Sequence, residues 1–194
     1  MPQKYLKMIL NAPVYDVAHE TPLDIAPRLS EKLDNKVLIK REDLQPVFSF
    51  KLRGAYNKLI NLTSEQKRRG VVAASAGNHA QGVALAADKL NIEATIVMPQ
   101  TTPDIKIEGV KKFGACVVLY GDDFSSAFTK AQEIATKTTS VFIPPFDDPL
   151  VIAGQGTIGI ELLRQCMEDI HAIFIPIGGG GLISGIGAYV KMVR

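Results

Sequence analysis

The chain is poor in the residues from which metal sites and disulfide networks are built. Its 194 residues include only two cysteines and three histidines. The cysteines form no metal or disulfide pattern, which favours a reducing compartment such as the cytoplasm. The histidines are too scattered to predict a metal site. The residues concerned are Cys116, Cys166, His19, His79 and His171.

A large charge and a long apolar run are also lacking. The formal net charge is +2, so electrostatics favours neither a nucleic-acid partner nor an anionic membrane. No apolar run is long enough to span a membrane, and the run within residues 1–7 is too short for a signal peptide. With 46% hydrophobic residues, the chain can form one ample core or two small lobes. We expect a soluble, cytoplasmic protein.

Short apolar runs alternate with helical patterns along most of the chain. We expect strands at residues 37–40, 71–74, 94–98, 116–120, 141–143 and 172–177, and helices over 78–90, 149–167 and 183–194 and after residues 51, 63, 103 and 124. Residues 1–30 are expected to be irregular, because Pro13, Pro22 and Pro27 would break a long helix. Continuous apolar strands between amphipathic helices predict an α/β fold with a parallel sheet, whose ligands bind where strands end.

Residues 178–181, here the tetraglycine loop, lie between an expected strand and an expected helix. The first N–H groups of a helix have no intrahelical partner, and the helix dipole adds positive charge there. Because the loop has no side chains, an anion can approach those N–H groups closely. No Lys or Arg lies in the loop, so the backbone alone would hold the anion. The other interpretation is a turn that only packs.

Residues 75–82 form a second expected turn from strand to helix. The N–H groups of this turn and the Ser75 hydroxyl could bind a carboxylate, and the Asn78 amide could hold a ligand oxygen. Alternatively, Ser75 and Asn78 only cap the helix. Earlier in the chain, Lys51 lies between two apolar residues at another expected helix start. Desolvation and the helix dipole would lower its pKa and favour a nucleophilic amine, unless the side chain extends past its neighbours into water.

Two nucleotide-binding motifs are disfavoured. Gly154, Gly156 and Gly159 fit the dinucleotide pattern G-x-G-x-x-G, but the next expected strand ends in glycine where a ribose-binding acid is required. We interpret these glycines as close packing at a buried helix start. The tetraglycine loop lacks the Lys-Ser/Thr pair of a P-loop, which disfavours ATP. An amine nucleophile, an anion loop and a carboxylate-sized turn are what pyridoxal phosphate and an amino acid require, although spacing alone does not name the cofactor.

Three ordered motifs carry a family resemblance. Residues 49–55 (SFKLRGA), 75–82 (SAGNHAQG) and 178–182 (GGGGL) resemble motifs of the fold-type II pyridoxal-phosphate enzymes and, among these, of the threonine dehydratase family. Residues 37–43 and 144–157 are similar to its biosynthetic type. The resemblance implies parallel sheets flanked by helices, with a small lobe (54–150) inserted into a larger one (1–53 and 151–194). The family's catalytic unit continues beyond residue 194, which implies an N-terminal part with an incomplete larger lobe.

The resemblance also assigns roles to residues. Lys51 would hold pyridoxal 5'-phosphate as a Schiff base and, once freed, remove the Cα proton of the substrate. Phe50 would pack beside the cofactor ring, and Asn78 would hydrogen-bond the phenolic oxygen of the ring. The phosphate would be bound by Gly178, Gly179, Gly180, Gly181 and Leu182. The loop that takes the substrate carboxylate would comprise Ser75, Ala76, Gly77 and His79.

The reaction implied by the resemblance is the deamination of L-threonine to 2-oxobutanoate and ammonia, the first step of isoleucine biosynthesis, in a homo-oligomer. Two alternatives stay open. One is a non-catalytic fragment that associates through apolar surface left exposed by the missing part. The other is a serine dehydratase or serine racemase, because methyl selectivity in a pocket is worth only about 1–3 kcal/mol.

Overall fold

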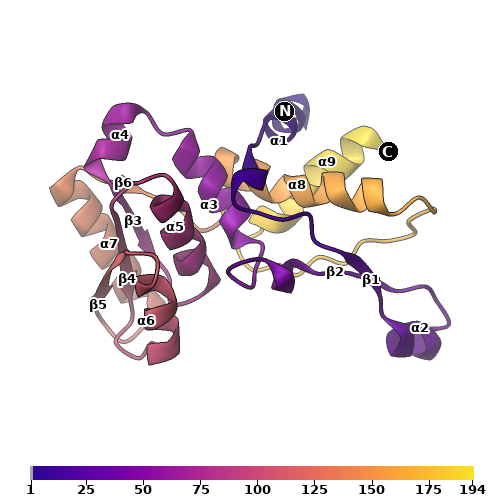
Figure 1. Cartoon of the computed structure of the whole chain (residues 1–194), viewed down its shortest axis with the longest axis horizontal. Coiled ribbons are helices and arrows are strands. Elements are labelled where there is room, and N and C mark those ends of the chain that lie inside the picture. Colours follow the sequence, from indigo (N-terminus) through magenta and orange to yellow (C-terminus); the bar gives the residue numbers. More distant parts are fainter. Residues whose placement is uncertain (1) are drawn as a thin grey trace.

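The computed structural model describes residues 2–194 (Figure 1). The helices are α1 (Pro2–Leu10), α2 (Pro27–Leu33), α3 (Lys51–Ile60), α4 (Ser64–Arg69), α5 (Asn78–Lys89), α6 (Asp104–Lys111), α7 (Phe124–Thr138), α8 (Pro149–Gln165) and α9 (Gly181–Val193), with short 3-10 helices η1 (Val14–Asp16) and η2 (Glu42–Leu44). The strands are β1 (Leu23–Ile25), β2 (Leu38–Lys40), β3 (Val71–Ala74), β4 (Ala94–Met98), β5 (Cys116–Leu119) and β6 (Val141–Phe142). No helix within this range combines the length and the apolar character that crossing a membrane requires.

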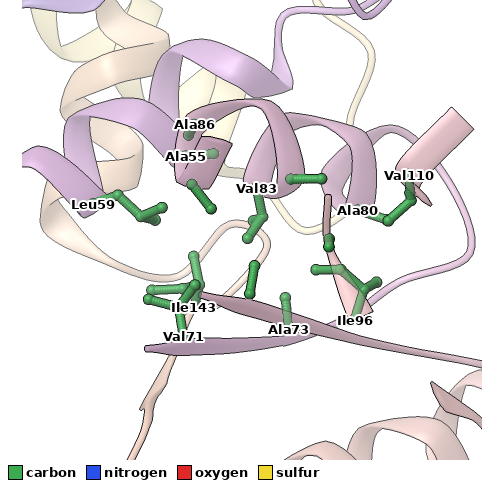
Figure 2. Packing of buried hydrophobic residues seen from close by; sticks show 14 of the residues in the cluster. Ala55, Leu59, Val71, Ala73, Ala80, Val83, Ala86, Ile96, Val110 and Ile143 are labelled. Carbon is green, nitrogen blue, oxygen red and sulfur yellow. The ribbon is translucent and has the colours of Figure 1, made fainter. Parts of the chain in front are cut away.

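The central feature is a four-stranded parallel sheet with the strand order β5-β4-β3-β6. Successive residues of β3 point to opposite faces of the sheet, and both faces are buried. Val71 and Ala73 belong to a core with α3, α5 and α6, whereas Val72 and Ala74 pack against α7. Figure 2 shows the first of these cores, in which helix residues such as Val83 lie over the sheet. Because helices cover both faces, the strand is apolar throughout, and the predicted parallel α/β architecture is confirmed.

The direction of strand addition reverses beside β3. The chain adds β4 and then β5 on one side of β3, and β6 returns to the other side. The Ile143 N–H donates to Val72 O over 2.8 Å, so β3 and β6 end side by side. In parallel sheets, ligands bind at the carboxyl ends of strands where the order reverses. Residues 75–78 and 143–146, which follow these two strands, therefore lie at the expected position of a site.

A group of helices lies beside the sheet, where α8 packs against α1, α3 and α9 (Figure 1). A Cβ at Gly154 would lie 2.6 Å from Arg53 O, and one at Gly156 would lie 3.0 Å from Gly185 O. The interpretation of Gly154, Gly156 and Gly159 as close packing is confirmed. They lie within the 17-residue helix α8 rather than at its start. The residues before Gly154 are helical too, so the strand that a dinucleotide fingerprint needs is replaced by helix.

The N-terminal region is more ordered than predicted. Residues 2–10 form α1, because a proline in the first turn lacks only an N–H that the helix does not use. Ile9 is buried against α8, where a Cβ at Gly156 would lie 2.6 Å from Ile9 Cδ1. After η1, β1 pairs with β2 in an antiparallel ladder in which Leu23 faces Lys40. The prediction that residues 1–30 are irregular is therefore wrong for α1, η1, β1 and the start of α2, whereas residues 11–13 and 17–22 do lack helix and strand. Met1 lies outside the described range.

The prediction of a strand at residues 172–177 is wrong. The segment is irregular, and no backbone within residues 2–194 pairs with it. Phe174 is 94% exposed and Ile177 is 66% exposed. An apolar run favours an extended chain, but a strand forms only where a neighbouring backbone supplies N–H and C=O partners. The helix that follows, α9, does form as predicted.

Candidate functional site

Lys51 is the first residue of α3, the helix that carries Leu52, Ala55 and Leu59 into the core. Its Nζ donates a hydrogen bond to Pro145 O over 2.7 Å and lies 5.5 Å from the centroid of the Phe50 ring. Burial lowers the pKa of this amine. The side chain therefore points to a backbone carbonyl in the protein, which fits the predicted nucleophile better than a lysine that extends into water.

The turn after β3 begins α5 without a side-chain cap. Gly77 is the N-cap residue, and no side chain accepts a hydrogen bond from the first turn of the helix. Instead, the Ser75 hydroxyl accepts from the Gly77 N–H over 3.1 Å, and Asn78 is exposed at the first helical position. The alternative interpretation, in which Ser75 and Asn78 only cap the helix, is wrong. The first N–H groups of α5 remain without intrahelical partners.

His79 is the buried member of this turn. Its side chain is 4% exposed, and Nε2 lies 3.0 Å from Ile143 O. A carbonyl oxygen accepts only, so this contact assigns the ring proton to Nε2. Burial lowers the pKa of His79 to about 4, against the opposing effect of the Ile143 carbonyl and with a further contribution from the charge of Lys51. The imidazole is therefore neutral near pH 7, and the charge of Lys51 contributes to the low pKa of His79.

The tetraglycine loop leads directly into α9. Gly180 is the N-cap residue with φ = 86°, a left-handed conformation that favours glycine, and Gly181 is the first helical residue. A Cβ at Gly178 or Gly180 would meet no atom within 4 Å. At Gly179 and Gly181, by contrast, a Cβ would meet Phe146. The loop therefore offers open backbone at two positions and is packed against an aromatic residue at the other two.

The three motifs converge on the segment that follows β6, residues 143–146. Ile143 O binds His79, Pro145 O binds Lys51, and Phe146 packs against the tetraglycine loop. The helix that follows β3 is held close to Lys51 as well, since a Cβ at Gly82 of α5 would lie 3.0 Å from the Lys51 carbonyl carbon. A half-buried amine and the tetraglycine loop thus contact one short segment at the reversal point of the sheet. This arrangement can hold a carbonyl compound that carries an anionic group.

Residues 14–194 match the family described as pyridoxal-phosphate dependent enzymes. The chain belongs to this family. Its fold is of type II within that family, as expected, because fold-type II enzymes are its structural neighbours.

The chain is similar to threonine dehydratases over nearly its whole length. It is 60% identical to threonine dehydratase 1 biosynthetic, chloroplastic, of Solanum lycopersicum, over 98% of this chain and 31% of that protein. The structure of the processed form of threonine deaminase isoform 2 from Solanum lycopersicum superposes with a TM-score of 0.96 at 58% identity, covering 99% of this chain and 53% of that one. Maize serine racemase superposes with a TM-score of 0.93 at 36% identity, covering 97% and 58%. This chain of the pyridoxal-phosphate dependent family spans about a third of the length of the curated relatives that it matches.

Motif analysis missed Pro145 and Phe146 as parts of this site. They follow the strand at 141–143, but a proline and a phenylalanine do not by themselves predict a contact with a lysine. The lysine that Pro145 contacts lies 94 residues earlier in the chain. Only the placement of β6 beside β3 could have pointed to them, because the carboxyl ends of neighbouring parallel strands meet. In this family member, the segment between the motifs holds the motifs together.

Proposed function

We propose that this chain is the cofactor-binding, N-terminal part of a threonine dehydratase, a pyridoxal-phosphate enzyme that deaminates L-threonine to 2-oxobutanoate and ammonia. That reaction is the first step of isoleucine biosynthesis. The observation that carries the proposal is that the Lys51 amine and the tetraglycine loop contact the same segment, residues 143–146. The names of relatives at 51–60% identity support the choice of threonine as substrate.

The residues at the site fit pyridoxal phosphate. The aldehyde of this cofactor reacts with an unprotonated amine, and Lys51 has a pKa lowered by burial. The phosphate needs donors without obstructing side chains, and the open backbone at Gly178 and Gly180 meets that need at a helix N-terminus. When bound, the cofactor supplies an electron sink for bond cleavage at the substrate Cα.

Lys51 has two tasks in this proposal. Its Nζ would hold the cofactor through its aldehyde carbon, and the same amine, when free, would act as the base that accepts the proton from the substrate Cα. Both tasks need the neutral amine, which burial favours. Phe50 would pack beside the cofactor ring, and Asn78 would donate to the phenolic oxygen of the ring. The N–H groups of Gly178, Gly179, Gly180, Gly181 and Leu182 would hold the phosphate.

The turn after β3 takes the substrate carboxylate. The start of α5 lacks a side-chain cap, so its first N–H groups are free for an anion. The carboxylate loop comprises Ser75, Ala76, Gly77 and His79. His79 contributes its backbone here, because its imidazole is buried and bonded to Ile143 O. A metal ion has no part in this proposal.

The wider properties follow the same reasoning. We propose a small lobe of residues 54–150, which holds the parallel sheet, and a larger lobe built from residues 1–53 and 151–194. Exposed apolar side chains such as Phe174 and Ile177 support association into a homo-oligomer. Two free thiols support a reducing, cytoplasmic location, although relatives are named for chloroplasts and mitochondria.

A second candidate is a serine-directed enzyme of the same family. The similarity to maize serine racemase supports it, since the fold and the cofactor motifs are shared. Threonine and serine differ by one methyl group, a difference worth only about 1–3 kcal/mol in a pocket. Assays of threonine and serine side by side, reading 2-oxobutanoate, pyruvate and D-serine, separate the two.

The decisive experiment traps the cofactor on the protein. The chain is incubated with pyridoxal phosphate and reduced with borohydride, and the modified lysine is located by peptide mass spectrometry. We expect the adduct on Lys51, its loss in Lys51→Ala, and no change in Lys137→Ala, which alters an exposed lysine on α7. An adduct at Lys51 without turnover of either amino acid identifies a non-catalytic fragment. An adduct spread over surface lysines, with none at Lys51, refutes the proposal.

A further inference from the structure

The tetraglycine loop has little of its own to keep it ordered. Glycine loses more conformational freedom on ordering than any other residue, and four in a row have no side chains with which to pack. The segment before the loop is irregular, and its residues Phe174 and Ile177 are exposed. The loop can therefore hold one conformation only if another part of the protein packs on its backbone.

Phe146 supplies that packing. A Cβ at Gly179 would overlap the Phe146 ring, 2.5 Å from Cδ2. A Cβ at Gly181 would lie 2.8 Å from Phe146 O and 3.2 Å from Phe146 Cβ. Gly180 needs glycine for its positive φ, but Gly179 has no positive φ. The lack of a side chain at position 179 is therefore explained by the aromatic ring that lies on it.

The segment that carries Phe146 is itself held on both sides. Before it, Ile143 O binds His79 and Pro145 O binds Lys51. After it, Asp148 caps α8 by accepting from Leu150 N and pairs with Lys58 over 2.6 Å. Phe146 is thus fixed relative to the Lys51 amine, although the residue as a whole is 37% exposed. A fixed ring on a glycine backbone sets the distance between the loop and the amine.

We propose that Phe146 is a positioning residue that holds the tetraglycine loop in the conformation that receives the phosphate of the cofactor. This inference rests on the proposed function for the identity of the ligand, but not for the ordering of the loop. Phe146 acts through the loop backbone and takes no part in the chemistry at Lys51.

The ordering is tested on the full 194-residue chain without ligand. Amide hydrogen exchange of the peptide covering residues 178–182 is compared in the wild type, Phe146→Ala and Phe174→Ala. We expect faster exchange in Phe146→Ala, because the loop loses its packing partner. Phe174→Ala removes an aromatic ring that is 94% exposed and should leave the exchange unchanged. Equal exchange in all three proteins overturns the proposal, whether or not the chain binds the cofactor.

The consequence for the ligand is tested by equilibrium dialysis with pyridoxal phosphate and with pyridoxal, which lacks the phosphate. Phe146→Ala should weaken binding of pyridoxal phosphate by about tenfold, the loss expected if one more residue must be ordered on binding, and leave pyridoxal nearly unaffected. Equal losses for both compounds overturn the proposal. If the wild type binds neither compound, the proposed function fails, and the exchange measurement still decides the ordering.

A double-mutant comparison isolates the contact. Gly179→Ala should accelerate exchange of the loop while Phe146 is present, since the new methyl group collides with the ring. In the Phe146→Ala background the same substitution should have little further effect, because the ring is gone. Gly187→Ala in α9, where a Cβ meets no atom within 4 Å, is the matched control. Additive effects of Gly179→Ala and Phe146→Ala contradict the assignment.

Discussion

At the scale of single residues, burial decides the charge of the two titratable side chains at the site. Desolvation favours the neutral form of a base, and it lowers the pKa of both Lys51 and His79. For Lys51 the neutral form is the reactive one. For His79 the neutral form still donates its Nε2–H to Ile143 O, so burial without charge costs it no hydrogen bond there. Burial therefore shifts both side chains towards their uncharged forms.

Substitution of His79 should change how stability depends on pH. Its pKa is about 4 in the folded chain and 6.5 in the unfolded chain, so between these values the unfolded chain binds more protons. The stability from His79 is therefore complete above pH 6.5 and is lost as the pH falls towards 4, a change on the order of 3 kcal/mol. His79→Gln, whose amide can donate to Ile143 O, should flatten this decline in urea titrations. His171→Gln, at an exposed position, should keep the wild-type slope. An unchanged slope in His79→Gln contradicts this interpretation.

At the scale of elements, glycine sets how closely α8 approaches its neighbours. Gly54 of α3 and Gly154 of α8 lie backbone to backbone, with a Cβ at Gly154 only 2.6 Å from Gly54 Cα. Gly185 of α9 makes the same approach on the other side, where its Cβ would lie 2.6 Å from Gly156 N. Helix α8 therefore packs directly against both α3 and α9 and fixes the distance between them. Since α3 begins at Lys51 and α9 begins at the tetraglycine loop, this spacing contributes to the site.

Two alanine substitutions in α9 should have opposite effects. Gly185→Ala forces a methyl group against the backbone of α8 and should cost about 1–3 kcal/mol of stability. Gly187→Ala, two residues on, meets no atom within 4 Å and should stabilise the helix by about 0.5–1 kcal/mol. Urea unfolding of both variants measures the difference. Similar midpoints for the two would show that α8 and α9 do not need their close contact.

At the scale of the whole molecule, a buried ionic cluster joins distant parts of the chain. Arg53 is fully buried and donates to Glu42 Oε2 over 2.8 Å and to Glu161 Oε1 over 2.6 Å. Lys40 pairs with Glu161 Oε2 over 2.6 Å, and the Tyr15 hydroxyl donates to Glu161 Oε1. Burial opposes ionisation of Glu161, but the hydrogen bonds and charges of Arg53 and Lys40 outweigh it and lower its pKa. Glu161 thereby links α8 to α3, β2 and η1.

Breaking this cluster should lower the free energy of unfolding far more than breaking an ion pair at the surface. Glu161→Gln removes the carboxylate that pairs with Lys40 and one of the two carboxylates that pair with the buried Arg53, and should cost about 3–5 kcal/mol of stability. Arg164→Ala removes a pair with Glu20 between exposed side chains and should cost less than about 1 kcal/mol. The two variants carry substitutions on the same helix, so their urea midpoints can be compared directly. A small effect of Glu161→Gln would mean that the cluster relaxes or takes up water.

Local chemistry in the sequence determined much of the fold. Thr63 and Gln66 form the predicted capping box, with Gln66 N donating to Thr63 Oγ1 over 3.2 Å and Thr63 N donating to Gln66 Oε1 over 2.9 Å. Gly70 ends that helix with φ = 76°. The strand at 71–74, the helix from Asn78 and the start of α3 at Lys51 also lie where the patterns predict. These features depend on residues a few positions apart, so the sequence contains all of their partners in one window.

Tertiary structure alone decided which of these pieces meet. The apolar run at 172–177 stayed irregular for want of a pairing backbone, whereas α1 formed because α8 covers Ile9. The contacts of Pro145 with Lys51 and of Phe146 with Gly179 join segments 94 and 33 residues apart. The motifs in the sequence determined which chemistry is possible, since residue types set pKa values and hydrogen-bonding capacity. Their assembly into one site required the pairing of β6 with β3. This pairing is a tertiary contact, and it brings together groups that lie far apart in the sequence.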